Sequence, residues 1–471
     1  MDTRSSAHAW AQAEFGSAEL GDARRTARAV KMAARAATSP GGKLSDVFTL
    51  PRELDAAYDF VESEHVPAAA IAQAHGRATA RRCAGLPYVR IPVDGSSLQL
   101  ADHERQKDFG SVGTVKAGAR GLKVISALAV DPTGVTRGVL SQVWWARQNA
   151  PPASANAKRK RRAQLPTDQK ETCRWLEVLD LAAHQLEDAG ILGWFQIDRE
   201  GDAWPILSAL ASSTHLFTVR SSWDRVVEGT GRDRQYLRAH LGKQLPVGVY
   251  ELEVPGRPAR QARAARMVMR SAQVNLRLRD RRTSKYHWQE VRAVWIREVG
   301  TTPRGEEPLD WLLLTNAPIG TLQNGREIVT GYAARWRIEE FHRAWKSGVC
   351  NVEDTQLRSR DAVIRWATIL AAVAARAERL KLLARQSPDR PATDELSEDE
   401  IGVLIALKRE EKKRTEVVPD GVPTLAQATR WLADLGGYTG KSSGGPPGSI
   451  TIRRGLDRVE WGARAVRAMR P

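Results

Sequence analysis

The 471-residue sequence has few cysteines and no long apolar run. Its three cysteines, Cys83, Cys173 and Cys350, lie far apart without metal-ligand spacing, which argues against a disulfide framework and a zinc site. So few cysteines are typical of a reducing cytoplasm. No apolar run reaches bilayer-spanning length, and residues 1–10 lack the apolar core of a signal peptide. We therefore expect a cytoplasmic protein that has no membrane partner.

Two motifs are also absent, and acidic residues are outnumbered. There is no GxxxxGK[ST] phosphate loop and no His-Glu-x-x-His zinc motif, so nucleotide hydrolysis and zinc-protease chemistry are not indicated. The chain carries 72 Lys+Arg against 55 Asp+Glu, a net charge of +17. This excess favours a polyanionic partner, most often nucleic acid, although an arginine-rich proteome would produce it as well.

Residues 1–70 have a helical pattern. Asp22 is a candidate helix cap, and further helices are expected from Pro51 and from Ala68. The helix after Asp22 is alanine-rich and basic, with Arg24, Arg25, Arg28, Lys31 and Arg35. Its basic face could lie on a phosphate backbone or simply be solvated, and this segment alone does not decide between them.

Strand-like sequence begins near residue 88. The run 88–100 has the β-branched content of a strand and contains Asp94. A carboxylate in such a run is costly to bury unless it is paired, so we expect either a bound cation or a turn or bulge at Asp94–Gly95. Runs 123–130 and 135–145, separated by the turn-like residues 131–134, predict a hairpin.

The next elements alternate between helix and strand. A helix is expected over 168–189, a buried strand over 194–198 that ends on Asp198, a helix over 203–212, and a strand over 215–220. A carboxylate at the end of a strand is a common position for chemistry in α/β sheets. The order strand-strand-strand-helix-strand-helix-strand is the layout of an RNase H-like fold, in which acidic residues from the first strand, the fourth strand and a late helix converge.

The stretch 331–348, GYAARWRIEEFHRAWKSG, predicts that late helix because it has no proline and no internal glycine. At 100° per residue, four polar residues fall within roughly 60° of one another. They are Tyr332, Arg335, Glu339 and Lys346. Ile338, Phe341 and Trp345 fall on the opposite side. The alternative interpretation is an ordinary amphipathic helix with a solvated charged face.

These residues together resemble a known family. Asp94 in VDGSS, Asp198 in DREGD, and Glu339 resemble the DDE triad of cut-and-paste transposases. The spacing from Tyr332 to Lys346 is similar to the Y-(2)-R-(3)-E-(6)-K signature of the bacterial insertion-sequence family called IS four. The similarity extends from WAQAEFGSAELGDARRTAR near the N-terminus to LADLGGY near the C-terminus, and so covers nearly the whole chain.

The resemblance implies a specific chemistry. Asp94, Asp198 and Glu339 would bind two Mg²⁺ ions, for which Mn²⁺ could substitute. Tyr332, Arg335 and Lys346 would hold neighbouring phosphates. Water would nick the transposon end, and the freed 3′-hydroxyl would form a hairpin on the opposite strand and later attack target DNA.

Two more residues and the partners are also implied by the family. Trp311 matches a tryptophan on which a flipped-out base stacks, and Arg220 matches an arginine that contacts the DNA near its end. The partners would be double-stranded DNA, both transposon end and target, and a second copy of the chain, giving a homodimer in the DNA complex. A bacterial cytoplasmic protein associated with the nucleoid when bound to DNA is expected.

The predicted fold class is α/β, an RNase H-like catalytic core with a mostly β insertion, flanked by helical N- and C-terminal domains. The boundaries are 1–70 for DNA binding, 71–365 for the catalytic domain with its insertion at about 221–310, and 366–471 for a helical domain that would supply dimer contacts. Alternation in the insertion places Arg277 and Arg279 on one face. Two basic segments have no definite role: the loop run 157–162 and the C-terminal tail from 452.

Two other classes of function remain open. A nuclease or resolvase of the same fold would use the same metals without joining strands. A regulatory, non-catalytic DNA-binding relative would be favoured by a damaged triad or a missing N-terminal region. Trp311 and the signature from Tyr332 to Lys346 favour a transposase over a nuclease or resolvase, and neither a damaged triad nor a missing N-terminal region is seen that would favour the regulatory relative.

Overall fold

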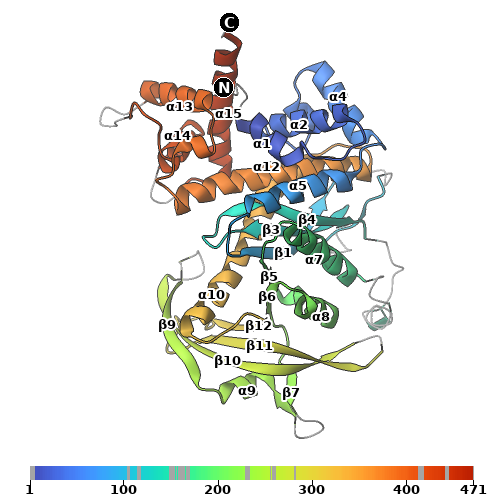
Figure 1. Cartoon of the computed structure of the whole chain (residues 1–471), viewed down its shortest axis with the longest axis vertical. Coiled ribbons are helices and arrows are strands. Elements are labelled where there is room, and N and C mark those ends of the chain that lie inside the picture. Colours follow the sequence, from blue (N-terminus) through green and yellow to red (C-terminus); the bar gives the residue numbers. More distant parts are fainter. Residues whose placement is uncertain are drawn as a thin grey trace. The chain divides into compact units, whose positions relative to one another are not determined.

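The computed structural model describes residues 6–102, 107–113, 118–147, 154, 156–157, 165, 170–228, 234–254, 256, 261–280, 283–411, 418–440 and 445–469. The chain forms two compact units (Figure 1). The first unit comprises Met1–Leu86, Gly95–Ala150 and Arg337–Pro471, and the second comprises Pro87–Asp94 and Pro151–Trp336. Strand β1 (Val89–Gln99) passes from the second unit into the first.

The N-terminal part of the first unit is helical, as predicted. Its helices are α1 (Ser6–Phe15), α2 (Ala23–Thr38), α3 (Leu44–Val47), α4 (Pro51–Glu62) and α5 (Ala68–Arg82). Asp22 caps α2, since its side chain accepts a hydrogen bond from the backbone N–H of Arg24 at 2.8 Å. Pro51 occupies the first turn of α4, where a missing N–H has no cost.

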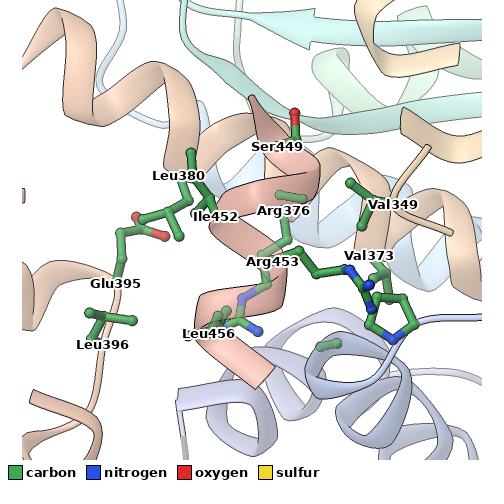
Figure 2. Close-up of a pocket in the computed structure, with 13 residues that line it drawn as sticks. Val349, Val373, Arg376, Leu380, Glu395, Leu396, Ser449, Ile452, Arg453 and Leu456 are labelled. Carbon is green, nitrogen blue, oxygen red and sulfur yellow. The ribbon is translucent and has the colours of Figure 1, made fainter. Parts of the chain in front are cut away.

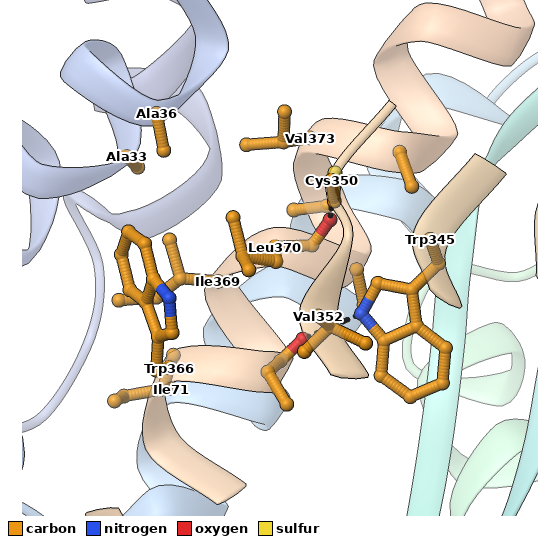
Figure 3. Packing of buried hydrophobic residues seen from close by; sticks show 14 of the residues in the cluster. Ala33, Ala36, Ile71, Trp345, Cys350, Val352, Trp366, Ile369, Leu370 and Val373 are labelled. Carbon is orange, nitrogen blue, oxygen red and sulfur yellow. Dashed lines mark hydrogen bonds between the residues drawn. The ribbon is translucent and has the colours of Figure 1, made fainter. Parts of the chain in front are cut away.

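The C-terminal part of the first unit is built around one long buried helix. The helices are α11 (Arg337–Lys346), α12 (Arg360–Gln386), α13 (Glu398–Glu411), α14 (Leu425–Leu435) and α15 (Ser449–Met469). Trp366 of α12 donates to the carbonyl of Gly42, and Trp345 of α11 donates to the carbonyl of Ala367. Figure 3 shows the two indoles among their apolar neighbours. Both indoles are fully buried, so α12 connects the N-terminal helices to α11 through one apolar core.

A hairpin completes the first unit. Strands β3 (Arg120–Val130) and β4 (Thr136–Trp145) pair antiparallel, and β2 (Gly110–Ser111) pairs with β3. The turn between β3 and β4 is closed by Asp131, whose carbonyl accepts from the N–H of Gly134 and whose side chain accepts from Thr133. The predicted hairpin is therefore confirmed.

The second unit contains a mixed sheet. Its strands follow the order β1, β5 (Gly193–Ile197), β6 (Leu216–Arg220), β12 (Asp310–Thr315), β11 (Tyr286–Glu298), β10 (Arg263–Arg279) and β9 (Pro246–Val254). The first three strands are parallel, and each later neighbour is antiparallel. Helices α7 (Thr172–Glu187) and α8 (Trp204–Ser212) lie between β4, β5 and β6 in the chain, in the predicted order.

The insertion after β6 is mostly β, as predicted. Besides β9 to β11 it holds the short strands β7 (Val226–Glu228) and β8 (Gln235–Tyr236) and the helix α9 (Leu237–Gly242). Arg277 and Arg279 alternate with buried Leu276 and Leu278, so both arginines are on one face of β10. The predicted class, α/β with a mixed sheet and helical flanking regions, is confirmed. The predicted domain boundaries stay a prediction.

One predicted element differs. The stretch 331–348 is not one α-helix: α10 (Leu322–Ala333) is followed by a 3₁₀ turn, Ala334–Trp336, and then by α11. Tyr332 therefore lies in the last turn of α10, and Glu339 lies in the first turn of α11. Because a 3₁₀ turn has 3.0 residues per turn, the angular spacing computed for an ideal α-helix does not hold across it. The buried side of α11 is as predicted, with Ile338, Phe341 and Trp345.

Candidate active site

Two of the predicted catalytic carboxylates lie at the same level of neighbouring strands. In the parallel pair β1–β5, Val93 is opposite Ile197, so the next residues, Asp94 and Asp198, are adjacent. Ile197 is in turn opposite Val219 of β6, so Arg220 extends the row. Neighbouring strands are about 4.8 Å apart. Strand register alone thus brings together two acids that are about a hundred positions apart in the sequence.

Asp94 lies inside β1, which continues through Gly95 to Gln99. The predicted alternative of a turn at Asp94–Gly95 is therefore wrong. The carboxylate is 19% exposed and has a cationic partner: Nη1 of Arg335 lies 3.3 Å from its Oδ2. This pair satisfies the physical requirement that made Asp94 conspicuous in the sequence, because a partly buried charge needs a counter-charge.

Arg335 reaches Asp94 from the 3₁₀ turn that follows α10. Gly331, in the last turn of α10, lets this helix approach the sheet. A Cβ at Gly331 would lie 3.3 Å from Nε of Arg90 on β1 and 3.4 Å from Nε2 of Gln196 on β5. Such spacing is tighter than ordinary van der Waals contact. Gly331 therefore allows α10 to pack closely on the two strands that carry the aspartates.

Asp198 ends β5 and caps the next turn. Its Oδ1 accepts from the backbone N–H of Glu200 at 2.8 Å, at the start of the 3₁₀ helix Arg199–Gly201. One turn on, the buried Asp202 accepts from the N–H of Ser222 at 2.7 Å and from Arg225. Asp202 therefore ties the segment after β5 to the segment after β6. The motif DREGD included this residue, but no role for it was predicted.

The predicted DNA-contacting residues Arg220, Trp311 and Tyr332 form one cluster. The ring of Trp311 meets the ring of Tyr332 edge-on, with centroids 5.4 Å apart, and the guanidinium of Arg220 lies 5.8 Å from the Trp311 ring. Burial raises the pKa of the Tyr332 hydroxyl, while the nearby Arg335 and Arg220 oppose that rise. The phenol is consequently a neutral hydrogen-bonding group at neutral pH.

Glu339 and Lys346 belong to α11 in the first unit, whereas the residues above belong to the second. Lys346 lies 3.6 Å from the carboxylate of Glu353. Across the described residues, no three His, Cys, Asp or Glu side chains form a group that could hold a metal ion. Asp94 and Asp198 are thus placed as neighbours, and the addition of Glu339 to them stays a prediction.

The donor set fits a hard divalent cation. Asp94 and Asp198 offer carboxylate oxygens, which Mg²⁺ prefers, and Mg²⁺ commonly keeps several waters and few protein ligands. The contact of Arg335 with Asp94 shows that this position already favours a positive charge. The three cysteines are free thiols, and two of them, Cys83 and Cys350, are buried.

Basic surfaces lie on elements outside this site. On α2, Arg24 pairs with Asp22 and Lys31 pairs with Glu53. On the insertion, the guanidinium of Arg277 lies 4.5 Å from the Tyr286 ring. The predicted basic run at 158–162 falls outside the described residues. No helix in the described part of the chain is long and apolar enough to cross a membrane.

Comparison with protein families agrees with this geometry. Residues 7–66 match the transposase DNA-binding family, and residues 233–375 match the transposase DDE domain. The second match contains Trp311, Tyr332, Arg335, Glu339 and Lys346, and the catalytic fold it denotes is RNase H-like. Together the two matches support a DDE transposase, an enzyme whose partner is DNA and whose DDE domain implies dependence on a divalent metal.

Proposed function

We propose that this protein is a cut-and-paste DNA transposase of the IS-four family, similar to the transposon five transposase. It would cleave transposon ends through a 3′-hydroxyl and a hairpin intermediate and then transfer the ends into target DNA. The observation that carries the proposal is the row on β1 and β5, where Asp94 and Asp198 are register neighbours and Arg335 contacts Asp94. The family matches at 7–66 and 233–375 supply the DNA substrate.

Asp94, Asp198 and Glu339 would be the metal ligands and so the catalytic residues. When bound, two Mg²⁺ ions, or Mn²⁺ in their place, would activate the attacking oxygen and neutralise the leaving oxygen. The cap made by Asp198 leaves its Oδ2 available while Oδ1 accepts from Glu200. Asp202 would hold Asp198 in place through Ser222 and Arg225.

The neighbouring polar groups would bind the DNA strand. Arg335 and Lys346 would each pair with a phosphate next to the scissile one, and the Tyr332 hydroxyl would donate to a phosphate oxygen. Trp311 would stack a flipped-out base, an interaction worth about 1–3 kcal/mol. Its ring contacts Tyr332 edge-on, and Arg220 lies beside it.

The remaining parts follow from the same proposal. Residues 1–70 would bind the terminal sequence, and 366–471 would contribute to a homodimer in the DNA complex. The protein would act in the bacterial cytoplasm, on the nucleoid. Two alternatives are a nuclease of the same fold and a regulatory DNA-binding relative, and they become outcomes of the test.

The test is cleavage of a labelled duplex carrying the element's own end, with Mg²⁺, by wild type, Asp198→Asn and Glu339→Gln. A matched control is Asp188→Asn, which removes an exposed carboxylate at the end of α7. We expect nicking and hairpin formation by wild type and the control, and a loss of at least about 10³-fold in both site variants, because each removes a charge that neutralises the transition state.

Other outcomes separate the alternatives. Nicking without hairpins or strand transfer would identify a nuclease. Tight binding of the end with no cleavage in Mg²⁺ or Mn²⁺ would identify a regulatory protein. Full cleavage by Glu339→Gln would remove that residue from the triad.

A further inference from the structure

The C-terminal helix α15 has a buried side and an exposed side. Ile452, Val459 and Ala463 are buried, and Ile452 and Leu456 line a small cavity of about 30 Å³ (Figure 2). The other walls of this cavity include Ala37 and Pro40 at the end of α2 and its following loop. Helix α15 therefore packs on the rest of the first unit through its apolar residues. Its opposite side consequently faces away from that core.

The exposed side of α15 is basic and carries a tryptophan. Arg454, Arg458, Trp461 and Arg464 are all exposed, and Trp461 is 54% exposed. At 100° per residue these four side chains lie within roughly 120° of one another. Within the described part of the chain, none of the three arginines forms an ion pair with a carboxylate. We call these four residues the α15 stripe.

The two acids of α15 are less exposed than this stripe, although Asp457, three residues after Arg454, falls on the same side of the helix. Glu460 is buried and lies 3.0 Å from Arg467. Asp457 is about half buried, and burial raises the pKa of its carboxyl although Arg453 and Arg35 oppose the rise. The three arginines of the stripe therefore outnumber the one partly buried acid on the same side of the helix.

The α15 stripe is continuous with a basic face of α2. Arg24, Arg28, Lys31 and Arg35 recur at spacings of four, three and four, so they lie on one face of that helix. Arg35, the last of them, has its guanidinium 5.5 Å from the ring of Trp461, and Arg464 lies 5.0 Å from the same ring. Helix α2 lies within the residues that match the transposase DNA-binding family.

We infer that α15 is a second DNA-binding helix, and that its stripe extends the duplex-binding surface of α2. The arginines contact backbone phosphates, and Trp461, whose ring lies near the guanidiniums of Arg35 and Arg464, packs on the sugar-phosphate edge. Charge complementarity and continuity with α2 favour duplex DNA over a second protein chain, whose approach would have to neutralise the same arginines. The inference rests on the proposed function, because it assumes that α2 binds DNA.

The test measures how the affinity of the full-length protein for a labelled duplex changes with salt. Each phosphate contact contributes about 0.9 to the slope of log K against log salt. The variant Arg454→Gln/Arg458→Gln/Arg464→Gln should lower that slope by about 2–3 and weaken binding at every salt concentration. The control Arg390→Gln/Arg409→Gln/Arg430→Gln removes the same charge from exposed arginines that pair with Asp394, Asp420 and Asp434. It should leave the slope within about 0.5 of wild type.

A crosslinking experiment tests the position of the stripe directly. Trp461 is replaced by the photocrosslinking residue p-benzoylphenylalanine, and the full-length protein is irradiated with the labelled duplex. Crosslinks to DNA are expected. Crosslinks that join two protein chains instead would overturn the inference in favour of an interface between copies.

A third variant separates this inference from the proposed function. Arg28→Gln on α2 should also lower the slope, by about 0.9. If the α2 variant lowers the slope but the α15 variant behaves like the control, the inference about α15 is wrong and the proposed function stands. If neither variant changes binding, the DNA-binding role of the N-terminal helices is wrong as well.

Discussion

At the scale of single residues, the least replaceable charge in the N-terminal helices is Glu14 of α1. It is 1% exposed and pairs with Arg82 of α5 and with Nδ1 of His75 at 2.6 Å. Nε2 of His75 accepts from the backbone N–H of Val139 at 3.3 Å, so Nδ1 is the nitrogen that donates to Glu14. This network links α1, α5 and β4 within the first unit.

The network predicts both a mutational effect and a pH dependence. Burial alone would raise the pKa of Glu14, but Arg82 and then His75 lower it to about 2 from 4.5. Because the folded-state pKa is depressed, the stabilisation is fully present above pH 4.5 and is lost as pH falls toward 2. Glu14→Gln should lower the free energy of unfolding at pH 7 by about 3 kcal/mol.

Denaturant unfolding of wild type and variant between pH 3 and pH 7 measures this effect. The difference between the two proteins should shrink as the pH falls below about 4.5. Glu19→Gln is the matched control, because Glu19 is 87% exposed and its ion pair with Arg77 is long, at 3.7 Å. Its effect on the free energy of unfolding should stay below about 0.5 kcal/mol. An equal loss of stability in both variants would contradict the importance given to burial.

At the scale of elements, two glycines in helices of the C-terminal region should respond oppositely to the same substitution. A Cβ at Gly455 of α15 would lie 1.7 Å from the carbonyl oxygen of Leu432 on α14, which is a backbone atom that cannot rotate away. A Cβ at Gly402 of α13 would meet nothing within 4 Å. Gly455→Ala should therefore destabilise by about 1–3 kcal/mol, as in other overpacked sites. Gly402→Ala should stabilise by up to about 1 kcal/mol through helix propensity.

Thermal unfolding of the two alanine variants decides the point. A shift of the same sign in both would mean that helix propensity, rather than the close approach of α14 and α15, determines the cost at Gly455. The result also bears on DNA binding, since Gly455 helps to set the position of the α15 stripe.

Sequence patterns predicted elements well where local signals mark their ends. Helices α4 and α5 begin where predicted, at Pro51 and Ala68, and a proline in the first turn gives the physical reason for α4. The 3₁₀ turn at Ala334–Trp336 was missed, because no proline or glycine marks it and its cause lies in tertiary packing. The contact of Arg335 with Asp94 joins residues 241 positions apart, and no local pattern contains such information.

At the scale of the whole molecule, the candidate site depends on the order of the strands and not on any single motif. The adjacency of Asp94 and Asp198 follows from strand order and register, both of which an alternating strand-helix pattern constrains. The residues that match the DNA-binding family end at position 66, before either carboxylate. Binding of the transposon end and phosphodiester chemistry should consequently have separate requirements.

Removal of divalent metal should separate the two activities. In EDTA, at an ionic strength matched to the Mg²⁺ buffer, the full-length protein should bind the transposon-end duplex within about 0.5 kcal/mol of its affinity in Mg²⁺, roughly a factor of two. Cleavage should disappear and return when Mg²⁺ is restored.

The matching of ionic strength matters because cations compete with arginine for phosphate, and the +17 net charge makes binding sensitive to salt. Fluorescence anisotropy and cleavage measured on the same labelled duplex report both activities. A loss of binding of more than about tenfold in EDTA would mean that the metal also organises the DNA-binding surface, because helices whose arginines and lysines contact phosphate directly need no metal to do so.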